Sequence, residues 1–339
     1  MKQGRVVGID LGMAIALLAF SALIISGSVS GWESLAGTFE NNIVEDVFPA
    51  FLFYMFGFRS SFVIRTALPG PKRSLRYFFV RGSAIIILGL LNYFLNDDLF
   101  LIGIGLCVLL SPVICLLHTS FLYFFMFSGA ILSLIVSMGN IEDASMMLNS
   151  KQHWWEMFIF LRHDAMLPWL MFYFFGLIIG RKNFGEEKWF RYFFSSSVIF
   201  LAFSILANFL INNSFNGSYL QDEHGASRLF PFNIYLYRPA FLLMALPLCN
   251  LLLIASSLLS AKMMESKFWG GVFRIGQFHL SYLLIAITTS GLLHGTAEGQ
   301  MAIASSISLA YVVLIFILAT STKDLIQNGP IEWFVQRMY

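Results

Sequence analysis

The stretch VVGIDLGMAIALLAFSALIISGS, residues 6–28, decides the fold, because Asp10 is its single charged residue. A helix needs about 20 apolar residues to cross the hydrocarbon core of a membrane. Inside hydrocarbon every backbone polar group must be satisfied within the segment, so this stretch is expected to be a helix. The run is too long for a signal peptide and no convincing cleavage site follows it, so we interpret it as the first membrane span.

The rest of the chain repeats this apolar character. Hydrophobic residues make up 58% of the sequence and charged residues 12%, with a mean hydropathy of +0.76. Soluble domains carry about a quarter charged residues. Nine further apolar runs are found at 43–64, 78–96, 99–117, 119–138, 165–180, 192–212, 239–260, 271–293 and 300–320. The sequence therefore predicts an all-α, polytopic integral membrane helix bundle of about ten transmembrane helices.

The positions of the charges predict the orientation of these helices. With the N-terminus placed in the cytoplasm, all but four of the 21 Lys and Arg residues fall in cytoplasmic segments. The four exceptions are Lys151, Arg162, Arg228 and Arg238. Basic residues are enriched in cytoplasmic loops, so both chain ends are predicted to lie inside, in a multi-pass protein of the cell membrane, expected to be a bacterial inner membrane.

Two parts of the chain are distinguished by composition. Residues 1–321 contain all the apolar runs and are predicted to form one transmembrane helical domain. Residues 322–339, TKDLIQNGPIEWFVQRMY, are polar and aromatic together. We expect this C-terminal segment to lie along the cytoplasmic interface, with Trp333 and Tyr339 at headgroup depth.

The most basic segment of the chain is RSSFVIRTALPGPKRSLRYFFVR, residues 59–81. One interpretation is a topology signal that touches anionic lipid. The other is a cradle for a phosphate-bearing donor such as acyl-CoA, held by Arg73, Arg76 and Arg81, because the planar guanidinium group makes bidentate contacts with phosphate. A structural pairing of Asp10 with Arg5 or Arg81 is a further alternative.

Acids and histidines near the span ends are the candidate catalytic groups. Asp46 opens the second run, where an acid is costly unless it meets water or a partner. His163 and Asp164 precede the sixth run, and a histidine can act as a general base for a hydroxyl group. His279 lies inside the ninth run and shares a helix face with Tyr282.

We expect Asp46, His279 and Tyr282 to line a water-filled cavity that opens outward, with His163 and Asp164 as further candidates on the same side. The alternative is that Asp46 caps its own helix and His279 bonds a backbone carbonyl.

Other kinds of site are not indicated. The sequence has no Gly-rich phosphate loop, no serine elbow and no metal-spaced Cys/His cluster, so no metal is expected. Cys107, Cys115 and Cys249 lie singly in apolar runs and are predicted to be reduced. The net charge of +2 is too small to indicate a nucleic-acid partner.

Four stretches resemble the transmembrane acyltransferase-like superfamily, which includes heparan-α-glucosaminide N-acetyltransferase-like and YeiB-like membrane proteins. They are RVVGIDLGMAIALL (5–18), VEDVFPAFLFYMFGF (44–58), HDAMLPWLMFYFFGLIIGR (163–181), and the pair RIGQFHLSYLL (274–284) with GPIEWFVQRMY (329–339). The third stretch resembles the family's Pro-Trp helix that ends in Gly-Arg, which adds Trp169 and Arg181 to the candidate substrate and donor sites.

The resemblance implies ten or eleven helices and transfer of an acyl group from cytoplasmic acyl-CoA, such as acetyl-CoA, to an acceptor beyond the membrane. The sequence departs from the family pattern in two places. No arginine follows Asp10 in the first helix, and residues 31–45 contain no histidine before Asp46. Catalysis would need another base, or this member is not catalytic.

The leading hypothesis is a membrane-bound acyltransferase with Arg73, Arg76, Arg81 and Arg181 on the acyl-CoA donor. Asp46, His163 or His279 would position or deprotonate a glycan or lipid-linked acceptor, with Asp164, Trp169 and Tyr282 beside it. The alternative is a non-catalytic relative that transports or binds a lipid or glycan. Membrane lipids are the expected partners, and the sequence leaves open a homodimer or a structural role in a membrane complex.

Overall fold

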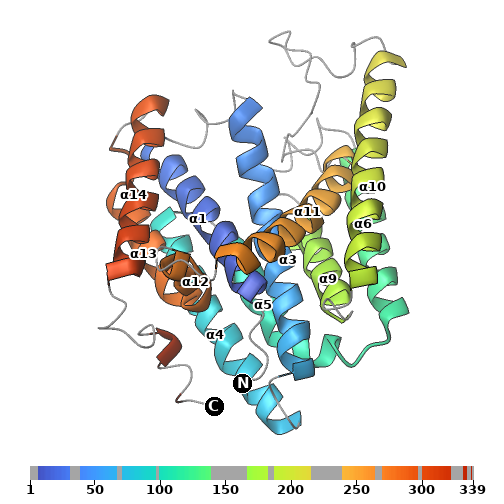
Figure 1. Ribbon diagram of the computed structural model, residues 1–339. Helices are drawn as coiled ribbons and strands as arrows, with labels where there is room; N and C mark the ends of the chain where they lie inside the picture. The colour runs from blue at the N-terminus through green and yellow to red at the C-terminus, as the bar shows by residue number, and fades with distance from the viewer. Residues whose placement is uncertain are drawn as a thin grey trace, which may run out of the picture.

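A computed structural model describes residues 7–30, 39–66, 71–96, 99–138, 166–181, 187–214, 239–263, 269–296, 300–321, 331–333 and 337. These ranges contain helices joined by short turns and no strand (Figure 1). The named helices are α1 (Val7–Ser30), α3 (Phe39–Thr66), α4 (Pro71–Asn96), α5 (Phe100–Ile114), α6 (Thr119–Met138), α9 (Met166–Gly180), α10 (Glu187–Ser214), α11 (Pro239–Met263), α12 (Trp269–Gln277), α13 (His279–Leu292) and α14 (Met301–Ser321). The all-α fold class is therefore confirmed for the described residues.

Helices occupy the apolar runs predicted from the sequence, with one difference. The ninth run, 271–293, was predicted as one helix, but the chain breaks at Phe278 into α12 and α13, which are bent by 87°. Both helices are short, so neither alone spans a membrane. The bend places two helix ends inside the bundle, and the candidate site is built around them.

Four of the described helices are long and apolar enough to cross a membrane: Gly8–Val29, Val47–Arg65, Ser74–Asn96 and Ala302–Ser321. The bent pair α12–α13 makes a fifth candidate if it counts as one span. Several long apolar helices of this kind are typical of a membrane protein.

Helices α3 and α9 pack backbone against backbone at the centre of the bundle. A Cβ atom on Gly57 would overlap the carbonyl group of Tyr173, and one on Gly176 would overlap the carbonyl group of Tyr54. Small residues permit such close approach between membrane helices, where dispersion contacts are the main source of attraction. The pair holds α3, and with it Arg59, in a fixed position.

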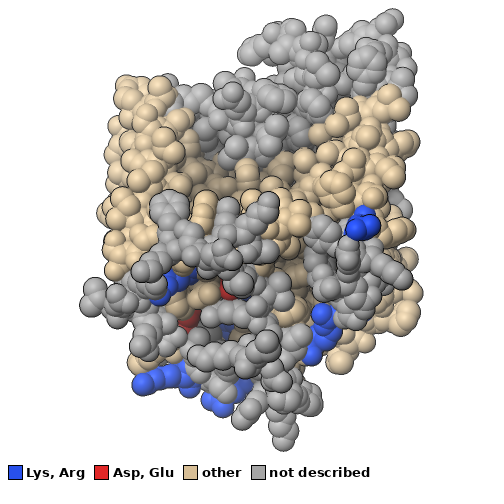
Figure 2. Space-filling model, in the orientation of Figure 1, with Lys and Arg blue, Asp and Glu red and all other residues tan. Residues whose placement is uncertain are grey.

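The outer surface is also apolar. Phe94, Leu292 and Leu116 are 79%, 83% and 86% exposed. Figure 2 shows the Lys and Arg side chains of this face in its middle and lower parts, while the upper part of the described surface carries no charged side chain. Exposed apolar faces of this extent are unusual in soluble monomers and suit contact with lipid.

Candidate functional site

The break between α12 and α13 is possible because a glycine lets α12 approach α1. A Cβ atom on Gly276 would overlap the backbone carbonyl of Asp10, so any other residue would force the two helices apart. The break leaves carbonyl groups without helical partners at the end of α12 and N–H groups without helical partners at the start of α13. Inside an apolar bundle these groups need partners from other parts of the chain.

Two charged side chains supply those partners. Arg59 Nη1 on α3 donates to the carbonyl oxygen of Gly276 at 3.0 Å. The buried Glu332 carboxylate accepts from the backbone N–H of Leu280 at 2.6 Å and of Ser281 at 3.2 Å, and from the Ser281 hydroxyl. A cation thus meets the C-terminal end of one helix and an anion the N-terminal end of the next, as the helix dipoles favour.

His279, the first residue of α13, lies fully buried between two arginines. Arg81 Nη2 contacts its Nε2, and Arg59 Nη1 lies 3.4 Å from its Nδ1. The Phe56 ring meets the imidazole edge-on at a centroid distance of 5.6 Å. A guanidinium group can only donate and a neutral imidazole has one lone pair, so the contact with Arg81 places that lone pair on Nε2.

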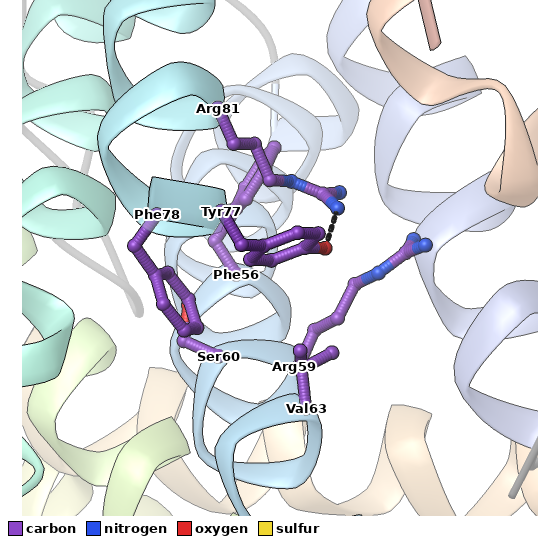
Figure 3. A pocket seen from close by; sticks show the side chains of 7 residues that line it. All are labelled: Phe56, Arg59, Ser60, Val63, Tyr77, Phe78 and Arg81. Atoms are coloured by element: carbon purple, nitrogen blue, oxygen red, sulfur yellow. Dashed lines mark hydrogen bonds between the residues drawn. The ribbon is translucent and has the colours of Figure 1, made fainter. Parts of the chain in front are cut away.

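A pocket opens beside this cluster (Figure 3). Figure 3 shows Arg59 and Arg81 reaching toward the same side of it, with the Tyr77 hydroxyl, which accepts from Arg81 Nη1, between them. The space within it, part of which is open to the surface, is about 190 Å³. Its lining consists of Phe56, Arg59, Ser60, Val63, Tyr77, Phe78 and Arg81.

The chemistry of this lining suits an anion. The two guanidinium groups donate in a planar fork that matches phosphate and carboxylate, and the hydroxyl groups of Tyr77 and Ser60 add further donors. The enclosed part of this space has room for about one water molecule. An anionic group would therefore meet the two guanidinium groups from the open side of the pocket, with the rest of a nucleotide or lipid outside it.

Of the residues predicted to bind the donor, Arg81 belongs to this cluster. Arg76 is exposed on α4, and the side chain of Arg73 lies outside the described residues. Arg59 was not among the residues predicted to bind the donor, although its place directly after the aromatic run that ends at Phe58 could have indicated it. Glu332 was also not selected, and its buried position differs from the interfacial one expected for its segment.

Arg181 lies elsewhere. Its guanidinium group donates to the Thr119 hydroxyl at 3.0 Å and to the carbonyl oxygen of Cys115 at 3.0 Å. Arg65 in turn donates to the carbonyl oxygen of Arg181 at 3.0 Å. These contacts attach the end of α9 to the turn between α5 and α6 and to α3, so Arg181 has a structural role here.

Two residues predicted to bind substrate are part of the packing. Trp169 is buried and lies against Phe53 and Phe100 at centroid distances of 6.2 and 5.4 Å. Tyr282 packs against the apolar cluster formed by α1, α12, α13 and α14, whereas His279 contacts α3 and α4. Although they share a helix face in sequence terms, Tyr282 and His279 therefore meet different neighbours.

The acidic candidate whose backbone is described, Asp46, lies far from the cluster. The backbone of Asp46 lies on α3 about 20 Å along the helix from Arg59, at a rise of about 1.5 Å per residue. The structure therefore does not bring Asp46 and His279 together, and the side chain of Asp46 lies outside the described residues. His163 and Asp164 also lie outside them. The buried carboxylate of Asp10 accepts from Gln277 Nε2 at 3.4 Å, while Arg81 bonds Tyr77 and His279.

Among the side chains that the structure describes, no three His, Cys, Asp or Glu residues lie close enough to hold a metal ion. Cys107, Cys115 and Cys249 are free thiols. The chemistry available at the site is therefore that of the arginines, the imidazole and the hydroxyl groups.

Compared with protein families, curated proteins and solved structures, the chain has no match. The resemblance to transmembrane acyltransferase-like proteins stays a prediction from the sequence. Two of the stretches that carry it, 274–284 and 329–339, meet at the break between α12 and α13 through Ser281 and Glu332.

Proposed function

We propose that the protein is a membrane-bound acyltransferase that moves an acyl group, such as acetyl, from cytoplasmic acyl-CoA to an extracytoplasmic glycan or lipid-linked acceptor. The observations that support this most are the contacts of His279 with Arg59 and Arg81 and the pocket that these two arginines help to line. The arginines offer a phosphate site, and the imidazole beside them is the kind of base that acyl transfer uses.

The proposed topology is about ten spans with both ends in the cytoplasm of a cell-membrane protein. The arginines with described side chains all belong to the group predicted to be cytoplasmic; they are Arg59, Arg65, Arg76, Arg81, Arg181, Arg191, Arg274 and Arg337. With Cys115 replaced by Ser, thiol labels at R76C and T296C should react from opposite sides of the membrane, because both positions are exposed. Labelling from one side would contradict the topology.

In the proposed reaction Arg59 and Arg81 bind donor phosphate. Arg81 then turns from His279 Nε2 toward the phosphate and frees the imidazole lone pair. His279 takes the proton of the acceptor hydroxyl as its oxygen attacks the thioester carbon. A C–O bond forms, the C–S bond breaks, and the CoA thiolate leaves and accepts the proton that His279 carries.

A second function, transport or binding of a lipid or glycan without catalysis, is favoured by the helix break itself. Secondary transporters commonly bind substrate at discontinuous helices, whose free ends carry partial charges. Arg59 and Arg81, which line the pocket, would bind one anionic headgroup at its open side. In this alternative Arg81 and His279 bind substrate and no proton is transferred.

One experiment separates the acyltransferase from the carrier. Membrane vesicles that contain the full chain are given acetyl-CoA with a radiolabelled acetyl group. Label should move into a glycan or lipid fraction, and H279N should abolish this transfer while R181Q, which leaves the pocket intact, should retain it. Native mass spectrometry of the purified protein reports the bound ligand. A retained anionic lipid with no transfer of label would overturn the enzyme and favour the carrier.

A further inference from the structure

The C-terminal segment reaches into the bundle at the start of α13. Glu332 is 7% exposed, and its two carboxylate oxygens accept from Leu280 N, Ser281 N and Ser281 Oγ. The backbone N–H of Ile331 donates to Ser281 Oγ at 3.2 Å. Ser281 thus donates to one residue of this segment and accepts from another, which fixes the segment against the helix in one register.

This contact replaces a missing local cap. Helices usually begin with Ser, Thr, Asp or Asn, whose side chain accepts from the backbone N–H groups of the first turn. Phe278 holds the N-cap position of α13 and makes no side-chain cap hydrogen bond. A carboxylate more than fifty residues later in the sequence accepts from these N–H groups in place of a local cap.

The position of His279 depends on that cap for a geometric reason. The Leu280 N–H, which donates to Glu332 Oε1 at 2.6 Å, belongs to the peptide group that follows His279. On the other side of His279, Arg59 holds the carbonyl of Gly276. The residue is therefore clamped between two charged side chains that come from α3 and from the C-terminal segment.

We infer that Glu332 is a positioning residue, which holds His279 with its Nε2 toward Arg81, a residue that lines the pocket. The inference rests on the proposed function in that His279 works at this site. Its primary readout, the state of the His279 ring, does not require any substrate. Trp333 provides a matched control, because it is the next residue, is 43% exposed and stacks on Arg337 at 4.0 Å from its guanidinium carbon.

The test is ring-¹⁵N NMR of the full chain in lipid nanodiscs with labelled histidine, the His279 signals being those lost in H279N. The wild type should show one tautomer with the lone pair on Nε2. E332Q keeps one oxygen for the backbone N–H groups of Leu280 and Ser281 but removes the negative charge and places an amide NH2 group opposite Ser281 Oγ. The weaker cap should shift the His279 signals toward the average of two tautomers. E332D should restore them in part, and W333A should leave them unchanged.

Acyl transfer by E332Q should fall about tenfold, the cost of one lost helix cap expressed as a rate. S281A removes a single hydrogen bond to the same carboxylate, so it should shift the His279 signals in the same direction but less than E332Q does. If E332Q does not fold, S281A is the variant that tests the inference. Unchanged His279 signals in a folded E332Q or S281A protein would overturn the inference. Shifted signals in a protein that transfers no acyl group would keep the inference and reject the acyltransferase.

Discussion

Arg81 and Arg181 were both predicted from the sequence to hold donor phosphates, yet they lie in different surroundings. Arg181 meets the backbone carbonyl of Cys115 and the hydroxyl of Thr119, at the turn between α5 and α6. Arg81 meets the imidazole of His279 and the hydroxyl of Tyr77, beside a pocket. The residue type is the same, and the partners across the helix interface decide the role.

The two arginines differ in whether a bound ligand could replace their hydrogen-bond partners. Carbonyl groups at the end of α5 have no partner within the helix, so the hydrogen bonds from Arg181 satisfy backbone groups of the fold. The contacts of Arg81 are with side chains that line a pocket, and an anion in that pocket would compete for the same guanidinium group. Arg181 is thus expected to control stability, and Arg81 to control binding.

The largest expected effect is that of G276V, which should disrupt the packing of α12 on α1 and with it the helix break beside Arg81. The new side chain would overlap the Asp10 carbonyl, which is backbone and cannot turn aside, so unfolding should become easier by at least about 3 kcal/mol. Thermal unfolding followed by size-exclusion in detergent measures this. G270V is the control, since a Cβ on Gly270 meets nothing within 4 Å. Equal stability of the two variants would contradict the packing of α12 on α1.

R181Q is expected to have the next largest effect on stability. It removes charge-assisted hydrogen bonds to Cys115 and Thr119, each of which contributes about 1.5–3 kcal/mol when well shielded and less where water reaches it. The melting temperature in detergent should fall, while the affinity for acetyl-CoA should not change. If R181Q instead bound acetyl-CoA more weakly with unchanged stability, Arg181 would belong to the donor site, and its proposed difference in role from Arg81 would be wrong.

The sequence predicted the features of the molecule that depend on local contacts better than those that depend on contacts between distant residues. The apolar runs predicted the helices because backbone hydrogen bonding in a helix is local. The break at Phe278 was missed because 271–293 contains no proline, although polar residues flank the break at Gln277 and His279. The site was predicted only in part, because Arg81 and His279 were selected separately. Their contact depends on the packing of α4 against α13 and on Glu332. No local sequence pattern reveals either of these.

The smallest effect is expected for R76Q, at the residue that directly precedes Tyr77 on α4 and lies five residues before Arg81. Arg76 is exposed, so its charge acts on an approaching anion through water and is screened by salt. Acetyl-CoA affinity should fall by less than about fivefold at low salt, and the difference should disappear near 0.5 M salt, where the screening length is only several ångströms. A loss that persists at high salt would place Arg76 in direct contact with the donor.

The most direct test of the account is the affinity of the full chain in nanodiscs for acetyl-CoA, measured by calorimetry for the wild type, R81Q and R181Q. Loss of a charge-assisted contact with phosphate should weaken binding to R81Q by about 10–100-fold. R181Q should bind like the wild type although it melts earlier. Equal affinity of R81Q and the wild type, or no binding of acetyl-CoA by the wild type, would contradict the assignment of Arg81 to the donor site.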